Sequence, residues 1–261
     1  MPTLPSVSDR PRRFKAEVAS TSQDIRAAQA LRHQVFAGEM GATLHSISEG
    51  LDHDEVDDYC DHLIVRDLLQ DKIVACSRLL PDYRASRLGR FYSEGEFDLT
   101  RVLAMPGRFL EIGRTCVDPN QRGSLVLGTL WNGLAEYVFE GGYHYLMGCA
   151  SIPPGPNGFS VDAICRSIAP HQFGPDELQV ASKRPIPPWR RCARDESGIP
   201  PLLQAYLRLG CWVFGDPYWD EDFDCMDLFI LLDLSRLQER YERRFLVPKA
   251  ARSEVDTRAV A

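Results

Sequence analysis

The sequence has no Cys-x-x-Cys pair, although it contains eight cysteines in 261 residues. They are scattered singly, at positions 60, 76, 116, 149, 165, 192, 211 and 225. Closely spaced cysteine pairs are the usual signature of disulfide frameworks and zinc sites. The pattern therefore predicts reduced thiols, and we expect no metal site.

Long apolar runs and an excess of positive charge are also missing. No stretch approaches the roughly 18 apolar residues that cross a bilayer, and the N-terminal MPTLPSVSDRPRRFK has no apolar signal segment. We therefore expect a cytoplasmic protein. The formal net charge of −7 argues against a nucleic-acid-binding protein, although local basic clusters can still bind an acidic partner.

Internal repeats and low-complexity linkers are absent, and 44% of the residues are hydrophobic. This composition is that of an ordinary globular protein. We expect one α/β domain over residues 14–247, with flexible tails at 1–13 and 248–261.

Hydrophobic periodicity predicts alternating strands and helices along this domain. We expect strands at 14–19, 62–67, 72–80, 108–117, 145–152, 211–215 and 225–234. Helices are expected at 21–40, 124–140, 160–168, 199–210 and 235–245. Arg32 breaks the pattern, because it lies within the apolar stripe of the first helix.

The stretch FLEIGRTCVDPNQRGSLVLGTLW (109–131) carries two charges, Glu111 and Arg114, inside an otherwise apolar strand. Strict alternation predicts that Glu111 shares one face with Gly113 and Thr115, and that Arg114 shares the other with Ile112 and Cys116. The helix that follows begins with a motif typical of an anion site, formed by Arg122, Gly123, Ser124 and Leu125. A buried carboxylate beside such a helix can act as a general base, because burial raises its pKa. The alternative is that Glu111 and Arg114 form structural salt bridges.

This strand–loop–helix order resembles the GNAT N-acyltransferase superfamily, whose loop Q/R-x-x-G-x-G/A binds the pyrophosphate or phosphopantetheine of an acyl donor. Arg122 matches that loop, whereas Leu125 and Leu127 stand at its later glycine positions. LRHQVF, DEVDDY, SRLLP and EIGR resemble, in order, the signature of acyl-homoserine-lactone synthases. DDYCDHLIV, FYSEGEFDL and LWNGLAEYVFEGGYHYLMGCASI look closer still to ornithine lipid-forming N-acyltransferases, over about residues 13–246.

The resemblance implies a GNAT-like fold, with a mixed, mostly antiparallel central sheet flanked by helices. It also implies transfer of a 3-hydroxyacyl group from acyl carrier protein to the α-amine of ornithine, which gives lyso-ornithine lipid. Glu111 would be the base, and backbone N–H groups near Gly113 and Arg114 would stabilise the oxyanion. The acyl-phosphopantetheine of the carrier protein would be the donor, without a permanently bound cofactor. A route through Cys116 or Cys149 as nucleophile is the alternative.

The residues that resemble the acceptor side of these enzymes are Arg32, Phe36, Asp54, Asp57, Asp58 and Arg78. The arginines, with Arg114, are candidates for the acceptor carboxylate or for an internal network with the acidic loop. The three aspartates could hold the ornithine side-chain ammonium, or they could be loop acids and caps.

An acidic carrier protein requires a basic docking surface. The candidates are Arg122, Lys183, Arg184, Arg190 and Arg191. Arginines on the expected last helix suit peripheral contact with the inner membrane, although an ordinary packed helix is the alternative. Two other functions remain open, which are acylation of a different amine, such as another amino acid or an S-adenosylmethionine-type acceptor, and a non-catalytic acyl-carrier-binding module.

Overall fold

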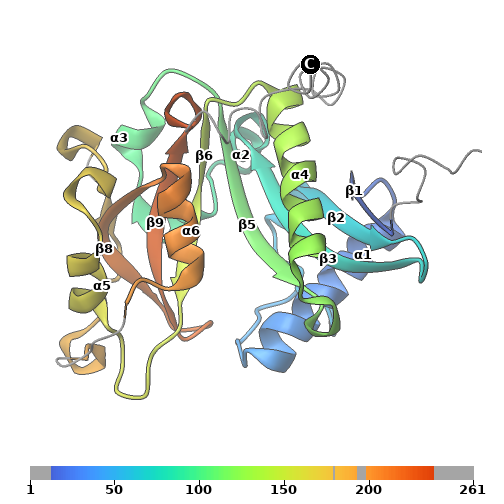
Figure 1. Cartoon of the computed structure of the whole chain (residues 1–261), viewed down its shortest axis with the longest axis horizontal. Helices are drawn as coiled ribbons and strands as arrows, with labels where there is room; N and C mark the ends of the chain where they lie inside the picture. Colours follow the sequence, from blue (N-terminus) through green and yellow to red (C-terminus); the bar gives the residue numbers. More distant parts are fainter. Residues whose placement is uncertain (1–12, 179, 193–197, 238–261) are drawn as a thin grey trace, which may run out of the picture.

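A seven-stranded sheet forms the centre of the computed structural model, which describes residues 13–178, 180–192 and 198–237. Its strands lie in the order β1-β2-β3-β5-β6-β9-β8, and only the β5–β6 pair is parallel (Figure 1). Their bounds are β1 Phe14–Val18, β2 Asp61–Asp67, β3 Lys72–Pro81, β5 Phe109–Val117, β6 Tyr145–Ile152, β8 Trp212–Asp220 and β9 Cys225–Asp233. A small second sheet pairs β4 (Phe97–Asp98) with β7 (Ala181–Ser182). The expected mixed, mostly antiparallel sheet is confirmed.

Six α-helices flank the described part of the sheet. They are α1 Ser22–His33, α2 Asp82–Leu88, α3 Thr100–Leu103, α4 Ser124–Gly141, α5 Val161–Ser167 and α6 Pro201–Leu209. A π-helical segment, Gln34–Glu39, continues α1 directly, so helical structure extends almost to the predicted end. Thr21 caps α1 by accepting a hydrogen bond from the Asp24 amide at 3.1 Å. None of the helices in the described ranges is long and apolar enough to cross a membrane.

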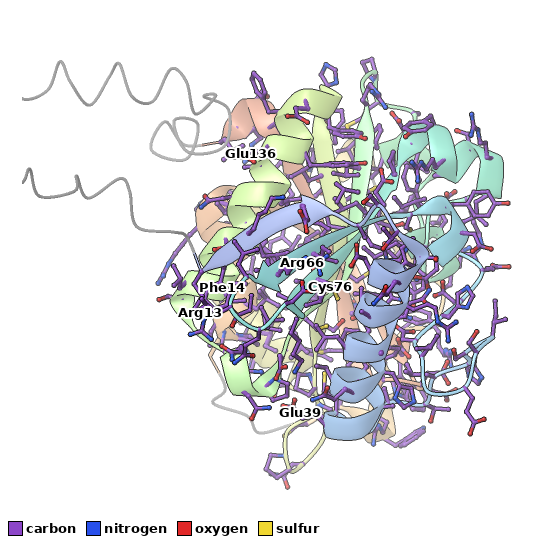
Figure 2. All side chains as sticks on the ribbon, turned by 90° about the vertical axis from the view of Figure 1, so that its right-hand side faces the viewer. Arg13, Phe14, Glu39, Arg66, Cys76 and Glu136 are labelled. Carbon is purple, nitrogen blue, oxygen red and sulfur yellow. The ribbon has the colours of Figure 1, made fainter. Side chains whose placement is uncertain are left out.

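Helices α1 and α4 lie on opposite faces of the sheet, as the edge-on view shows (Figure 2). On the face that carries α4, here called the α4 face, Leu130 and Leu134 pack against Leu63 and Leu79. On the other, the α1 face, Ala28 and Leu31 of α1 pack against Ile64, Cys76 and Cys116. Helix α6 joins α4 on its face, where Tyr206 packs edge-on against Trp131.

Most sequence-predicted elements are present, and the differences are at short or terminal segments. Helices α2 and α3 and the strands of the small sheet were not predicted, and β8 is longer than expected. A 3-10 turn covers Leu234–Arg236, where the last helix was expected to begin. The remainder of that helix and all but residue 13 of the expected tails lie outside the described residues.

The predicted facing of side chains on β5 is wrong beyond Gly113, because the strand contains a β-bulge. The register with β3 changes between Cys76↔Cys116 and Arg78↔Gly113, so two residues of β5 oppose one of β3. Arg114 sits in the bulge with a φ of 50°, a conformation rare for residues other than glycine. Ile112 therefore packs on the α4 face, whereas Cys116 packs on the α1 face instead of sharing a face with Ile112.

Strands β5 and β6 pair only at their first residues, over Phe109–Glu111 and Tyr145–Met147. Beyond this point the two strands separate (Figure 1). Gly148 follows the last paired residue of β6, and the two backbones still approach each other closely there, because a Cβ at this position would lie 2.4 Å from the Ile112 carbonyl oxygen. The strands therefore leave an opening in the sheet toward their C-terminal ends.

Candidate active site

A cavity of about 1060 Å³ occupies the opening between β5 and β6. Side chains from both faces of the sheet line it. Glu96, Glu111, Arg114 and Cys149 contribute on the α1 face, and Leu127, Trp131, Leu146, Tyr206, Leu209 and Leu232 on the α4 face. One side of the cavity is therefore polar and charged, and the other is largely apolar.

Glu111 lies on the polar side, at the last residue of β5 that pairs with β6, and is 4% exposed. Its carboxylate accepts hydrogen bonds from the Tyr92 amide at 2.6 Å, and from the Ser93 amide and hydroxyl at 2.7 and 2.5 Å. Burial raises the pKa of Glu111, and the three hydrogen bonds oppose that change by stabilising the charged form. The group is thus a buried carboxylate that is fixed in orientation and readily protonated.

Beside the cavity, three arginines and three aspartates form a buried ion cluster, defined as Arg32, Arg78, Arg114, Asp52, Asp54 and Asp57. Arg32 is 1% exposed and bonds to both Asp57 carboxylate oxygens, at 2.7 and 2.9 Å. Arg78 donates to Asp54 at 2.7 Å and to Asp57 at 3.2 Å. This pairing explains why a charged residue interrupts the apolar stripe of α1.

Electrostatics within the ion cluster favour the charged forms. Burial would raise the pKa of Asp54, but the charge and hydrogen bond of Arg78 lower it below its usual range. Burial likewise opposes charge on Arg78, and the neighbouring carboxylate of Asp54 nonetheless raises its pKa. The geometry favours the internal-network alternative for Arg32 and Arg78.

Arg114 belongs to the ion cluster and also lines the cavity. Its Nε is 3.3 Å from Asp52 without hydrogen-bond geometry, and this nitrogen has no other partner in the described structure. Three aromatic rings surround the guanidinium, with the Phe223 centroid at 4.6 Å and that of Tyr92 at 5.1 Å. The bulge places Arg114 here, on the face that carries Glu111, rather than on the α4 face.

The remaining predicted acceptor residues divide by position. Phe36 and Arg78 line the cavity, whereas Arg32, Asp54 and Asp57 lie in the ion cluster behind it. The Asp58 side chain is 77% exposed and faces His53 at 3.8 Å. The structure therefore does not bring Asp58 to the cavity.

The predicted donor residues lie around the N-terminus of α4. Arg122 and Gly123 line the cavity, and Ser124 and Leu125 follow in the first helical turn. Arg122 forms two hydrogen bonds of 2.6 Å with Glu39, at the end of the π-helical segment. The other candidate docking residues also have partners within the chain. Three of them form ion pairs, which are Arg184–Glu221, Arg190–Asp224 and Arg191–Asp162, the last at 4.0 Å. Lys183 donates a hydrogen bond to the Glu94 carbonyl at 2.6 Å.

Three further acids on the polar side were missed by the sequence reasoning. They are Glu96, Asp220 and Asp227, which are 6%, 9% and 3% exposed and line the same cavity. Asp227 had a detectable signal, because it is an acid within an apolar strand, as Glu111 is. Glu96 follows a turn in the acidic, aromatic connector before β5, and nothing in the sequence distinguishes it from the other acids there.

Two of these acids, Glu96 and Asp227, have raised pKa values. Burial and the nearby charge of Asp227 raise the pKa of Glu96 to about 9, and burial raises that of Asp227 to about 6. The Cys149 thiol donates to Glu96 at 3.1 Å. Burial and the same carboxylates keep the pKa of Cys149 well above its usual range, so its thiol is a poor nucleophile. The geometry therefore gives no support to the Cys149 route, and Cys116 is buried against Cys76 at 3.6 Å.

Known proteins resemble this chain in sequence and in fold. The family model described as an acetyltransferase (GNAT) domain matches residues 31–132. The chain is 35% identical to the L-ornithine N(alpha)-acyltransferase of Rhodobacter capsulatus, over 88% of this chain and 94% of the relative. It is 32% identical to the protein of the same name from Brucella abortus, over 87% of each. The solved structure of the AHL synthase LasI shares the fold, with a TM-score of 0.53 and 12% identity over 90% of this chain and 98% of that one.

Proposed function

The chain belongs to the L-ornithine N(alpha)-acyltransferase family, and from this premise we propose that it transfers a 3-hydroxyacyl group from acyl carrier protein to the α-amine of ornithine. The product would be lyso-ornithine lipid. The relatives establish an acyltransferase with a GNAT-like fold, as the sequence predicted. The observation that carries the proposal is the cavity through the sheet, which joins a charged compartment with Glu111 to an apolar one.

Donor and acceptor would occupy different compartments. The apolar side, between α4, α6 and the separated strands, suits an acyl chain and the thioester at its end. The phosphate of phosphopantetheine would lie near Arg122, Gly123, Ser124 and Leu125, where backbone N–H groups of α4 lack helical partners. The ionised amino acid would enter the polar side, where Arg114 lines the cavity and its guanidinium could bind the acceptor carboxylate.

Glu111 would act as the general base. A carboxylate offers about four acceptor positions, and three of those of Glu111 are used by Tyr92 and Ser93. The remaining position can take a proton from the ornithine α-ammonium, directly or through a water. Its raised pKa supports this role, because a base must match the amine closely enough to accept its proton.

The freed amine would then attack the thioester carbonyl carbon. The N–C bond forms, the C–S bond breaks, and the departing thiolate takes the second amine proton. Gly113 and Arg114 line the cavity at the bulge, where backbone groups leave the strand ladder, and their N–H groups are candidates for stabilising the oxyanion. Because the amine attacks directly, no acyl-enzyme is required.

The product is an amphiphile, so we also expect the enzyme to contact the inner membrane peripherally when it releases the product. Carrier-protein docking at Arg122, Lys183, Arg184, Arg190 and Arg191 remains a prediction. Their present partners, which are acids for the four arginines and the Glu94 carbonyl for Lys183, would have to be replaced by acids of the carrier protein.

The test is a product assay by mass spectrometry. The purified chain receives 3-hydroxyacyl carrier protein and an equimolar mixture of amino acids that contains ornithine, with Glu111→Gln as the matched inactive control. N-acyl-ornithine as the single product would support donor and acceptor together. An acyl amide of another amine would retain the chemistry and refute the acceptor. No product, with the carrier protein still bound, would refute catalysis and favour the binding-module alternative.

A further inference from the structure

The acids of the buried ion cluster already have cationic partners. Asp57 bonds to Arg32 and Arg78, and Asp54 bonds to Arg78. A second cation, such as a ligand ammonium, would gain little from carboxylates whose charge is compensated within about 3 Å. A binding site for an additional positive charge is therefore to be sought elsewhere in the cavity.

Glu96 is one of the acids in the cavity that lack such a cationic partner among the described residues. Within the described residues, its carboxylate accepts a hydrogen bond only from the Cys149 thiol, through Oε2, and no cation contacts it. Asp227 accepts from Ser151 and from the Cys225 thiol at 3.7 Å. Both side chains are more than nine-tenths buried and both line the cavity. A buried carboxylate without a cation or an N–H donor is costly unless a ligand completes it.

The distance between the carboxylates of Glu111 and Glu96 limits the length of a ligand that can contact both. Three consecutive contacts of 2.5, 3.4 and 3.1 Å connect Glu111 through Ser93 and Cys149 to Glu96, so the two carboxylates are at most about 9 Å apart. The two nitrogens of an extended α,δ-diamino acid lie roughly 6 Å apart across five bonds. With a hydrogen bond of about 2.8 Å at each end, such a molecule can reach from one carboxylate to the other.

We propose that Glu96 and Asp227 bind the side-chain ammonium of the acceptor, while Glu111 faces its α-amine, so that the enzyme selects diamino acids by this carboxylate pair. Asp220, which shares the cavity wall with Asp227, adds to the negative potential. This assignment rests on the proposed function for the identity of the acceptor. It replaces the expected ammonium contacts at Asp54, Asp57 and Asp58.

The experiment compares ornithine with norvaline, which has the same carbon chain but no second amine. Acylation kinetics and calorimetric binding are measured for the full chain and for Glu96→Gln and Asp227→Asn, which keep size and remove charge. Asp216→Asn, an exposed acid on β8 outside this cavity, is the matched control. Loss of a charge-assisted hydrogen bond in a buried site predicts an about 10- to 100-fold drop in kcat/KM and affinity for ornithine, with norvaline unchanged.

Three results would each support or refute the proposed ammonium site. Equal binding of ornithine and norvaline by the unmodified chain would overturn the proposal even if both are acylated. Absence of turnover together with charge-dependent ornithine binding would support the site and refute only the catalytic function. Binding of Zn²⁺ or Mn²⁺ that the two variants abolish, with ornithine preference intact, would reassign the acids to a metal.

Discussion

Replacing Asp57 with asparagine tests whether the acidic loop binds the acceptor or has a structural role. Asparagine keeps the shape of the side chain and removes its charge. Asp57 is 4% exposed and accepts hydrogen bonds from Arg32, Arg78 and the Asp54 amide. His62 lies 3.5 Å from its carboxylate. If Asp57 is a structural residue, its loss leaves two buried guanidinium groups without their shared counterion.

The expected magnitude is large. Removing one partner of a buried ion pair destabilises by about 3–5 kcal/mol, which is a substantial part of the 5–15 kcal/mol that holds a typical domain folded. For a domain of this size each kcal/mol lowers the Tm by about 2–4 °C, so we expect a decrease of roughly 10 °C. The neighbouring Asp58→Asn, with an exposed side chain, should change stability by less than about 0.5 kcal/mol.

Thermal unfolding followed by circular dichroism, together with the KM for ornithine, forms the assay. A lowered Tm with a KM close to that of the unmodified enzyme at a permissive temperature is the expected result. An unchanged Tm with a tenfold higher KM would refute the reasoning and make Asp57 a substrate-binding residue.

Three further outcomes are expected. Glu111→Gln should lower kcat by about 10²–10⁴-fold, as for loss of a general base; near-normal turnover by mass spectrometry would remove Glu111 from catalysis. Ornithine affinity measured by calorimetry should increase from about pH 6 to about pH 9, because Glu96 and Asp227 must lose protons to bind an ammonium and their pKa values are raised to about 9 and 6; a pH-independent affinity would contradict their role, and Glu96→Gln should flatten the profile. Gly148→Ala should destabilise by about 1–3 kcal/mol and reduce transfer of long acyl chains, because the added Cβ meets the Ile112 carbonyl at 2.4 Å; an unaltered chain-length profile would show that this opening does not hold the acyl chain.

The pH behaviour depends on every group that faces Glu96. Burial raises the pKa of Glu96, the negative charges of Asp227 on β9, Asp220 on β8 and Glu111 on β5 raise it further, and the hydrogen bond from the Cys149 thiol of β6 lowers it. Arg114 is the cation that acts on Asp227. The unliganded site therefore retains a proton on Glu96 at neutral pH, and binding of an ammonium releases it.

Much of the fold could be predicted from local sequence patterns. Apolar periodicity located α4 and the central strands, since each buries one face or both. Arg32 within an apolar stripe correctly indicated an unusual position, which the ion cluster explains. The short helices α2 and α3 were not foreseen, because segments of one or two turns are stabilised mainly by tertiary packing.

The site was harder to predict, because it depends on departures from regular geometry. Strict alternation along β5 predicted that Ile112, Arg114 and Cys116 lie on the same face of the sheet. The extra residue of the bulge puts Ile112 and Cys116 on opposite faces. No periodic pattern encodes such a bulge. Glu96 lies 15 residues before Glu111 in the chain, and only the packing of the connector against β5 and β6 brings the two together.

The partial pairing of β5 and β6 also determines how a product can leave. In the proposed reaction each substrate would occupy one face of the sheet, but the amide that joins them would occupy both at once. If the opening were enclosed by the sheet on all sides, the acyl tail or the ionised head of the product would have to pass through the sheet. The strands instead separate toward their C-terminal ends, so the opening is a slot with a free end beside Arg122 and Pro153. The product could therefore leave sideways along this slot without either of its ends passing through the sheet.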